Sequence, residues 1–493
     1  MKYFFRRGCW LPFLVLLLAC SGKTQSREEA EAQNTKPNII YILADDLGYG
    51  DLSCYGQTKF TTPHLDKMAA EGMRFTQHYA GSPVCAPSRA ALMTGLHTGH
   101  TRVRGNYEVG PHGFGAGVAL KPEDITVAEV LKKAGYKTGL VGKWGLGVAG
   151  TTGEPQQKGF DYMFGFLNQG HAHFHYPEYL YRNGQKVELP GNQNGKREQY
   201  AQDLFHQEAL QFLDNNKNGQ APFFLYLALT VPHAEMLHPD DENLARFKGK
   251  FPEKPFVKKT QGKRIDDSLG TYNSSEMPHA AFAAMVTRLD AQVGQLLTHL
   301  KKLGLDKNTI VLFSSDNGPH KEAGADPVFF NSSGPLRGFK RDLYEGGIRV
   351  PLIVRWPGKI KAGSESNHIS AFWDFMPTAA ALAGTPSPAT DGISFLPTLL
   401  GNTQDQQQHD NLYWEFHENK TSNQAVRQGD WKGIRHRPSG PLELYNLKTD
   451  LAEKNNVAEA HPEIVSRLET MLSKVRTPSE IWSLKDDRTS APK

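Results

Sequence analysis

The segment Asn38 to Asp46 reads NIIYILADD, an apolar run that ends in two adjacent carboxylates. An unbroken apolar run of this length is typical of a β-strand that is covered on both faces. Three further segments have the same form, a short apolar run followed at once by polar residues: 138–141 (TGLV), 223–230 (FFLYLALT) and 309–313 (TIVLF). This repeated form favours a sheet whose central strands are buried.

Helical patterns separate the apolar runs. Thr126 and Glu129 have the spacing of a capping box, which indicates the start of a helix. Residues 281–303 repeat apolar side chains with a helical period before Gly304. Strands that alternate with helices predict an α/β fold, with a large, mainly parallel central sheet flanked by helices. Ligands bind beyond the carboxyl ends of such strands, so the four polar endings should converge on one edge.

The first nineteen residues differ in composition from the rest of the chain. A positively charged start, MKYFFRRG, precedes the apolar segment WLPFLVLLLA, which is too short to span a bilayer. This pattern predicts an export signal over residues 1–19, and its end, Leu-Leu-Ala-Cys20, resembles a bacterial lipobox. We therefore expect an exported lipoprotein of the bacterial periplasm or outer membrane, attached to the membrane only through lipid on Cys20 and a polar tether over residues 20–35. A plain secretory signal, with Cys20 incidental, is the alternative.

A polar stretch over residues 401–410, GNTQDQQQHD, interrupts the α/β pattern. We place a catalytic domain at residues 36–402 and a small α+β subdomain at residues 403–493. The strand-like pieces of this subdomain are residues 412–416, 424–427, 431–435 and 442–447, and a helical pattern follows from about 462 to 475. The order predicts a small antiparallel sheet with a closing helix.

The charge balance excludes one class of partner. The chain has 56 Lys and Arg residues against 52 Asp and Glu residues, and removal of the signal takes away three of the basic ones. The remaining chain is close to neutral, so no global basic field favours nucleic acid. An anionic substrate would have to be held by local charges.

Two strand ends that are far apart in the sequence carry oxygen ligands: Asp45 and Asp46 after the first strand, and Asp316 and Asn317 after the last. Three carboxylates and one amide suit a hard divalent cation. The irregular mixture suits calcium better than magnesium, because magnesium prefers to keep several waters. The sequence therefore predicts a Ca²⁺ site at the carboxyl edge of the sheet.

Cys85 lies in SPVCAPSRAALMTG, residues 82–95. Pro87 and Ser88 indicate the first turn of a short helix that ends at Gly95. Cys85 would then face free amide groups, which favour an anion on its side chain, and Arg89 would lie one turn later. A disulfide between Cys85 and Cys54 is the structural alternative, since an exported compartment permits one.

The stretch from Cys85 through Pro87, Ser88 and Arg89 to Thr94-Gly95 matches the signature of the type I sulfatases, and residues 135–144 resemble the second signature of that family. The resemblance extends from about Lys36 to the C-terminus. The chain resembles exported bacterial carbohydrate sulfatases of the alkaline phosphatase superfamily. It implies an alkaline-phosphatase-like fold. It also implies that a separate maturation enzyme converts Cys85 to formylglycine, which joins the calcium ligands.

The implied chemistry explains why the thiol is replaced. The hydrate of an aldehyde carries two hydroxyls on one carbon, so one hydroxyl can attack sulfur and the other can later expel sulfate as the aldehyde reforms. By resemblance, Arg89 and Lys143 make the attacking hydroxyl acidic, and Lys143 also contacts the sulfate. His233 binds sulfate near the leaving oxygen and protonates it, and Lys340 clamps a sulfate oxygen.

One position departs from the family pattern. Many members carry a histidine where this chain has Gly145, and that histidine usually contacts the formylglycine hydroxyl. The segment that begins at Asn168 lies where related enzymes supply another sulfate contact, so Gln169, His171 and His173 are our candidates for substrate binding. A surface loop or adventitious metal binding is the alternative for these histidines.

The resemblance implies hydrolysis of sulfate esters, and export favours a sulfated sugar or polysaccharide fragment as the substrate. Two other functions compete with it. A phosphoesterase or phosphonate hydrolase of the same superfamily would share the sheet, but commonly uses threonine, serine or two zinc ions. A non-catalytic glycan-binding lipoprotein would keep the fold without the activity.

Overall fold

Four buried parallel strands form the centre of an 11-stranded sheet. They are β10 (Thr309–Ser315), β1 (Asn38–Ala44), β9 (Phe223–Ala228) and β5 (Lys137–Lys143), side by side in that order. All seven residues of β1 are buried, as its unbroken apolar run predicts. Because these four strands are parallel, their carboxyl ends meet at one edge, which confirms the predicted α/β class.

The outer strands of the sheet contain its antiparallel pairings and were not predicted. The complete order is β12-β2-β11-β10-β1-β9-β5-β6-β7-β8, with β13 also paired to β2. These outer strands are β2 (Met73–Tyr79), β6 (Tyr162–Phe166), β7 (Tyr179–Arg182), β8 (Gln185–Glu188), β11 (Arg349–Arg355), β12 (Ser364–Ser366) and β13 (Ser370–Ala371). β11 pairs antiparallel with both β10 and β2, and β6 continues the parallel centre beside β5.

The computed structural model describes residues 1–4, 36–106, 109–110, 113–258, 272–418 and 421–486. The chain separates into two units, Met1–Lys36 and Pro37–Lys493. Most of the predicted export signal at 1–19, and the predicted tether at 20–35 with Cys20, lie outside the described residues. No helix within the described ranges has the length and apolar character needed to cross a membrane.

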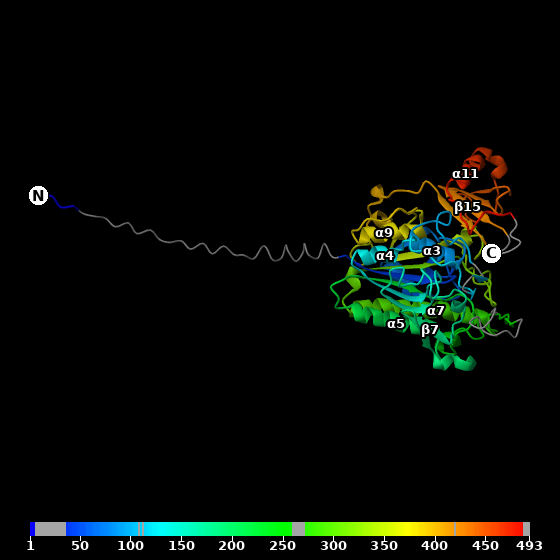
Figure 1. Cartoon of the computed structure of the whole chain (residues 1–493), viewed down its shortest axis with the longest axis horizontal. Helices are drawn as coiled ribbons and strands as arrows, with labels where there is room; N and C mark the ends of the chain where they lie inside the picture. Colours follow the sequence, from blue (N-terminus) through cyan, green and yellow to red (C-terminus); the bar gives the residue numbers. More distant parts are fainter. Residues whose placement is uncertain (5–35, 107–108, 111–112, 259–271, 419–420, 487–493) are drawn as a thin grey trace. The chain divides into compact units, whose positions relative to one another are not determined.

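Helices cover both faces of the large sheet (Figure 1). α2 (Pro63–Ala70), α5 (Ala201–Asn216) and α7 (Pro278–Lys302) pack on the face that carries Ile40 and Ile42 of β1. α3 (Cys85–Thr94), α4 (Val127–Lys133) and α9 (Phe375–Leu382) pack on the opposite face. Alternate residues of β1 thus enter two separate cores, as in any strand buried on both sides.

Local sequence signals fix the helix ends. Thr126 and Glu129 form the predicted capping box at the start of α4. α7 begins three residues before the predicted start and ends at Lys302, with Pro278 in its first turn. The shorter elements of the body are η1 (Ser53–Tyr55), β3 (Val109–Gly110), β4 (Gly113–Phe114), η2 (His171–His173), η3 (Pro190–Gly195), α6 (Glu242–Ala245), η4 (Asp306–Asn308), α8 (Glu345–Ile348), η5 (Phe372–Asp374) and α10 (Leu396–Leu399).

The predicted C-terminal sheet is present. Its antiparallel strands are β14 (Leu412–Phe416), β15 (Asn423–Gln428), β16 (Trp431–Arg435) and β17 (Glu443–Asn446), followed by the closing helix α11 (Pro462–Lys474), with η6 (Thr403–Asp405) before them and η7 (Ala458–Ala460) between β17 and α11. Leu468 and Leu472 of α11 pack on Tyr413 and Val426. The sheet belongs to the unit Pro37–Lys493, and the boundary at 402/403 stays a prediction.

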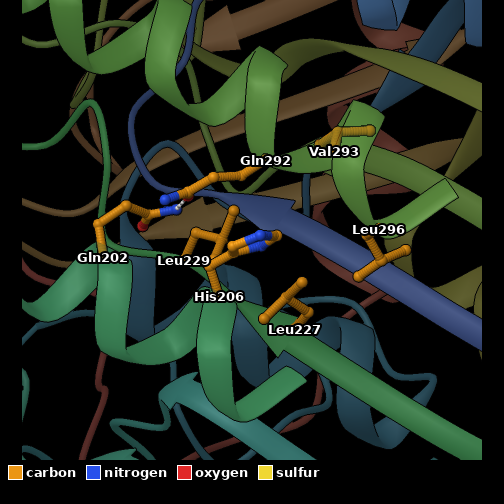
Figure 2. A pocket seen from close by; sticks show the side chains of 7 residues that line it. All are labelled: Gln202, His206, Leu227, Leu229, Gln292, Val293 and Leu296. Carbon is orange, nitrogen blue, oxygen red and sulfur yellow. Dashed lines mark hydrogen bonds between the residues drawn. The ribbon is translucent and has the colours of Figure 1, made fainter. Parts of the chain in front are cut away.

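A small internal cavity of about 10 Å³ lies between α5, α7 and β9 (Figure 2). The side chains that line it are Gln202, His206, Leu227, Leu229, Gln292, Val293 and Leu296. The Nε2 group of Gln202 donates a hydrogen bond of 2.6 Å to Oε1 of Gln292. A space of this volume holds at most one water, so this cavity is a detail of core packing.

Candidate active site

The structure brings together nine side chains that the sequence analysis singled out at the carboxyl edge of the large sheet. We call them the strand-end cluster, and each is at most 8% exposed. Its members are Asp45, Asp46, Cys85, Arg89, Lys143, His233, Asp316, Asn317 and Lys340. They come from the ends of β1, β5, β9 and β10, from α3, and from the loop before α8.

The two pairs of oxygen ligands are in direct contact. The chain turns sharply after β1, where Asp46 adopts a φ of 64°, a conformation that aspartate tolerates better than most residues. The Asp46 amide donates to Oδ1 of Asp316 over 3.1 Å, and Asn317 Nδ2 donates to Oδ1 of Asp46 over 2.6 Å. The predicted convergence of the ends of β1 and β10 is therefore present.

Cys85 is the first residue of α3, and Gly95 ends the helix with a φ of 70°. The Cys85 Sγ lies 3.3 Å from Oδ1 of Asp45. Cys85 and Cys54 are both free, so they do not form a disulfide. Burial, followed by the charge of Asp45, raises the pKa of the Cys85 thiol well above its usual range, although Lys143 and Lys340 act in the opposite direction. Burial and the charge of Asp45 therefore oppose the anion that we expected on the thiol.

Arg89 links three parts of the cluster. Its Nε and Nη2 groups donate to Oδ2 of Asp316 over 3.0 and 2.8 Å, and Nη1 donates to the carbonyl of Lys143 over 2.9 Å. Nη2 also lies 3.6 Å from Oδ1 of Asp45, the oxygen beside the Cys85 sulfur. Arg89 thus approaches Cys85 through Asp45, while it fixes the end of β5 relative to the end of β10.

Two lysines neutralise the two aspartates that follow β1. Lys143 Nζ lies 2.7 Å from Oδ2 of Asp45, and Lys340 Nζ lies 2.7 Å from Oδ2 of Asp46. Burial opposes the charge on Lys143, but Asp45 raises its pKa above the usual value. Burial would raise the pKa of Asp45, but the charges of Lys143 and Arg89 hold it well below its usual range. Both partners are therefore ionised at neutral pH.

His233 is neutral in this setting. Burial, followed by the charge of Lys340, lowers the pKa of His233 well below its usual value. Its Nδ1 donates to the carbonyl of Ala234, which leaves Nε2 to accept a hydrogen bond of 3.0 Å from Lys340 Nζ. The proton between these two residues is therefore held by Lys340.

The oxygen atoms of the cluster fit a cation. Asp45, Asp46, Cys85 and His233 each place one ligand atom within 4.8 Å of the others. The buried Oδ1 of Asn317 has no hydrogen-bond partner within the described ranges. An unsatisfied amide oxygen beside three carboxylates is the donor set that a hard cation binds.

A cavity of about 180 Å³ opens beside the cluster. Its walls include Cys85 and Lys340 of the cluster, and two of the predicted substrate-binding residues, Gln169 and His173. The other lining residues are Ala86, Asn106, Gly115, Gly117, Gly170, Tyr272, Glu322, Arg341 and Glu418. The cavity therefore gives access to Cys85 from the side on which α3 begins.

The three candidates for substrate binding lie in different places. The His173 ring stacks on His233, with 4.5 Å between ring centroids. The His171 ring instead packs against Phe166 and Tyr179, at centroid distances of 4.9 and 4.4 Å, and does not line the cavity. Gln169 lines the cavity and is 8% exposed. The structure therefore separates His171 from the other two.

Gln169 occupies the space beside Gly145. Gly145 has a φ of 75°, and a Cβ built on it would lie only 2.0 Å from Nε2 of Gln169. A side chain at position 145 and the observed position of Gln169 therefore exclude each other. The departure from the family pattern at Gly145 is accompanied by a second side chain that fills the gap.

Glu322, Tyr272 and Arg341 also reach the cavity and were missed by the sequence analysis. The Tyr272 hydroxyl donates to Oε2 of Glu322 over 2.7 Å, and Arg341 Nη1 lies 2.6 Å from Oε1 of Glu322. Glu322 lies 3.8 Å from Lys340 Nζ. These three residues lie in loops, where no periodic sequence pattern marks them as part of the site. Only Arg341, which follows Lys340 directly in the sequence, could have been predicted.

Comparisons with known proteins agree with this arrangement. The sulfatase family profile matches residues 37–385, and the profile of the N-sulphoglucosamine sulphohydrolase C-terminal region matches residues 338–478. An N-acetylgalactosamine-6-O-sulfatase of Bacteroides thetaiotaomicron is 32% identical over 95% of this chain and 98% of its own length. Human arylsulfatase A is 33% identical over 88% of this chain and 87% of its own length.

Solved structures support the same assignment. Ps i-CgsB, solved in complex with k-i-k-neocarrahexaose, has a TM-score of 0.74 at 29% identity, over 90% of this chain and 94% of its own. A sulfatase of glycosaminoglycan metabolism in Bacteroides thetaiotaomicron has a TM-score of 0.71 at 30% identity, over 90% of this chain and all of its own. The chain therefore belongs to the sulfatase family of the alkaline phosphatase superfamily and is an enzyme of the sulfatase class.

Proposed function

We propose that this sulfatase hydrolyses a sulfate ester on a sugar or polysaccharide fragment, with a formylglycine made from Cys85 and a bound calcium ion. The observation that carries the proposal is the position of Cys85. Its sulfur lies 3.3 Å from Asp45, at the wall of a cavity whose other walls include Lys340 and Gln169.

The environment of Cys85 favours replacement of the thiol. Burial and Asp45 raise the pKa of this thiol, and a neutral thiol is a poor nucleophile. Formylglycine, made by a separate maturation enzyme, would supply hydroxyl groups at the same position. Asp45 and Lys143 then stand where they can hold and move the proton of such a hydroxyl.

Asp45, Asp46, Asp316 and Asn317, with the converted side chain at position 85, would hold the calcium ion. The unpartnered Oδ1 of Asn317 supports this assignment, because its amide nitrogen is already bonded to Asp46. Bound there, calcium would lower the pKa of a ligated hydroxyl and neutralise sulfate charge. Lys143 and Lys340, which pair with the aspartates, would be released in part toward the sulfate.

The remaining side chains would bind the sulfate, deliver a proton or position the carboxylates. Lys340 would donate to a sulfate oxygen, and it holds a proton hydrogen-bonded to Nε2 of His233. Lys340 and His233 together can therefore deliver a proton to the leaving oxygen. Arg89 pairs with Asp316 and approaches Asp45, so it acts through the carboxylates that it holds.

A sugar substrate is supported by the relatives. The relatives in sequence include an N-acetylgalactosamine-6-O-sulfatase, and one structural neighbour at 29% identity was solved in complex with k-i-k-neocarrahexaose. A phosphonate monoester hydrolase also shares the fold, at 20% identity and a TM-score of 0.62, which concerns the fold alone. We propose that the enzyme acts after export, as a lipoprotein anchored through Cys20.

The test compares sulfate esters with phosphate esters, and aryl with sugar leaving groups, in one assay. The mature enzyme is given p-nitrophenyl sulfate, a panel of position-defined sulfated sugars, and the matching phosphates. We expect sulfated sugars to be turned over with the highest kcat/KM. Preference for the phosphates would contradict the sulfatase assignment, and binding of sulfated sugars without any turnover by chains that carry formylglycine would favour a glycan-binding protein.

A further inference from the structure

One carboxylate oxygen at the wall of the cavity of about 180 Å³ is unused by the protein. It belongs to Glu418, which follows β14 of the small C-terminal sheet and lines the same cavity as Cys85 and Lys340. Oε2 of Glu418 is shielded from bulk solvent and has no hydrogen-bond partner among the residues that the structure describes. Buried acceptors are normally satisfied, so this oxygen indicates a donor that a ligand would supply.

Arg341 pairs with Glu418 but does not supply that donor. Its Nε donates to Oε1 of Glu418 over 2.8 Å, and its Nη1 lies 2.6 Å from Oε1 of Glu322. Elsewhere in the molecule, Arg355 donates to both oxygens of Asp306, over 2.7 and 3.2 Å, and so leaves neither of them free. The pair at the cavity wall is different, because one of the two oxygens of Glu418 stays available.

The backbone fixes Arg341 beside the site. Arg341 has a φ of 78°, in the left-handed region that arginine rarely adopts, and its amide donates to the carbonyl of Pro83 over 3.0 Å. Pro83 lies two residues before Cys85, so the turn that carries Lys340 and Arg341 is tied to the start of α3. A strained residue at the wall of a cavity is typical of a functional site. The carboxylate of Glu418 is thereby fixed relative to position 85.

The charges at this wall favour a neutral ligand group. Glu322 and Glu418 carry two negative charges against the one positive charge of Arg341. Lys340 Nζ lies 3.8 Å from Glu322, but it pairs more closely, over 2.7 Å, with Asp46. A second anion here would face like charge, which is unfavourable. A hydroxyl group is neutral and has a hydrogen to donate, so it fits the free oxygen.

We propose that Glu418 is a specificity-determining residue whose Oε2 accepts a hydrogen bond from a hydroxyl on the sugar ring that carries the sulfate. Together with Glu322, it disfavours a second sulfate or a carboxylate on that ring. This inference rests on the proposed function, because it requires a sulfated sugar in the cavity beside Cys85. It narrows the substrate class to sugars whose ring carries one sulfate and a free hydroxyl.

The main test compares substrates with and without sugar hydroxyls. Glu418→Ala removes the acceptor, so KM should rise roughly 10- to 100-fold for the sulfated monosaccharide with the highest kcat/KM in the panel. p-Nitrophenyl sulfate has no hydroxyl to donate, so its turnover should be unchanged. An equal loss on both substrates would show that Glu418 only holds Arg341 in place, and would overturn the proposal.

Glu418→Gln tests the effect of charge while the shape is kept. The probes are the same monosaccharide with one and with two sulfates, compared by the ratio of their kcat/KM values. Loss of the negative charge should lower the preference for the monosulfated sugar roughly tenfold. An unchanged ratio would contradict the exclusion of a second anion.

Monodeoxy analogues of the same sulfated monosaccharide identify the hydroxyl. Removal of the hydroxyl that donates to Glu418 should raise KM in the wild type. The same removal should have no further effect in Glu418→Ala, because both changes remove one contact. Additive losses for every analogue would contradict the contact.

Glu208→Gln is the matched control. Glu208 on α5 is also a largely buried glutamate that pairs with an arginine, Arg182, over 2.5 Å, and it does not line the large cavity. This change should leave all substrate preferences as in the wild type.

Calorimetric titration of the panel sugars into the full chain measures their affinities without turnover. A wild-type protein that binds these sugars but hydrolyses none would refute the proposed function, and the titration would still report on Glu418. Unchanged sugar affinity in Glu418→Ala would overturn the role of Glu418 and leave the proposed function intact.

Discussion

Among the clusters of buried charge in the described residues, two differ in how far their polar atoms are satisfied. The junction cluster consists of Glu415 on β14 with Arg104, His417, Arg476 and Tyr413. Oε1 of Glu415 accepts from Arg104 and His417 over 2.9 and 2.8 Å, and Oε2 accepts from Arg476 and Tyr413 over 2.6 and 2.9 Å. Both carboxylate oxygens are fully used by the protein.

The strand-end cluster is equally buried but incomplete. Oδ1 of Asn317 and, next to the cluster, Nε2 of Gln169 have no partners within the described ranges, and a cavity of about 180 Å³ lies beside them. Three aspartates also crowd together, and burial with the charge of Asp45 raises the pKa of Asp316. The junction cluster is thus satisfied within the protein, whereas the strand-end cluster has a donor and an acceptor left for a ligand.

The largest expected effect is at Cys85. Cys85→Ala should reduce sulfate-ester hydrolysis by about 10⁴-fold or more, because it removes the proposed nucleophile. The thermal unfolding temperature should change little, since only one atom is lost. Cys54→Ala is the control, because burial raises the pKa of Cys54 to about 12 and this half-buried thiol lies outside the cluster. Full activity in Cys85→Ala would contradict the assignment of the nucleophile to position 85.

Glu415→Gln should act on stability instead of catalysis. The change leaves Arg104 and Arg476 without their anionic partner, and breaking a buried ion pair typically costs 3–5 kcal/mol. Urea denaturation would measure the loss, with the exposed Glu463→Gln as the control. Turnover per folded molecule should remain close to that of the wild type, and a selective loss of kcat would show that the junction cluster also serves the active site.

Removal of the cation should affect the strand-end cluster and leave the junction cluster unchanged. A chelator of calcium should abolish activity and lower the stability of the enzyme, by about 2.7 kcal/mol relative to calcium at a hundredfold excess over its Kd. Added Ca²⁺ should restore both, and Asn317→Ala should weaken this calcium response. The same calcium-dependent increment should persist in Glu415→Gln. A chelator without effect on stability would contradict a cation at the strand-end cluster.

The smallest effect is a dependence of stability on acid. Burial would raise the pKa of Glu415, but hydrogen bonds from His417 and Arg476 and the charge of Arg104 hold it well below its usual range. The stabilisation is therefore complete above the unfolded-state pKa of about 4.3 and is lost as pH falls below it, by up to about 1.4 kcal/mol per pH unit. Unfolding curves measured between about pH 3 and 6, on both sides of the unfolded-state pKa, would test this. The free energy of unfolding should fall less steeply with decreasing pH in Glu415→Gln than in the wild type. An equal slope would contradict the assignment.

The centre of the fold was predictable because its strands are buried on both faces. β11 shows why the edges were not. Its sequence, RVPLIVR, contains Pro351, and a proline argues against an interior strand. The proline is tolerated because the register of β11 against β2 shifts between Val350 and Leu352. That shift is a property of the assembled sheet, so no local pattern in the sequence reveals it.

The site was predictable where chemistry follows directly from a strand end, as for Asp45 and Asp316. It was not predictable where spatial packing decides. His171 and His173 are two residues apart in η2, and side chains at that spacing on a 3₁₀-helix point in different directions. Which of them faces His233, and that Gln169 fills the space at Gly145, depend on loops from several elements.

The most direct measurement is mass spectrometry of the peptide that spans Cys85, taken from an active preparation of the enzyme. We expect an aldehyde in place of the thiol, in a fraction of molecules that scales with the specific activity across preparations. Full activity in a preparation that carries only the unmodified thiol at position 85 would contradict it.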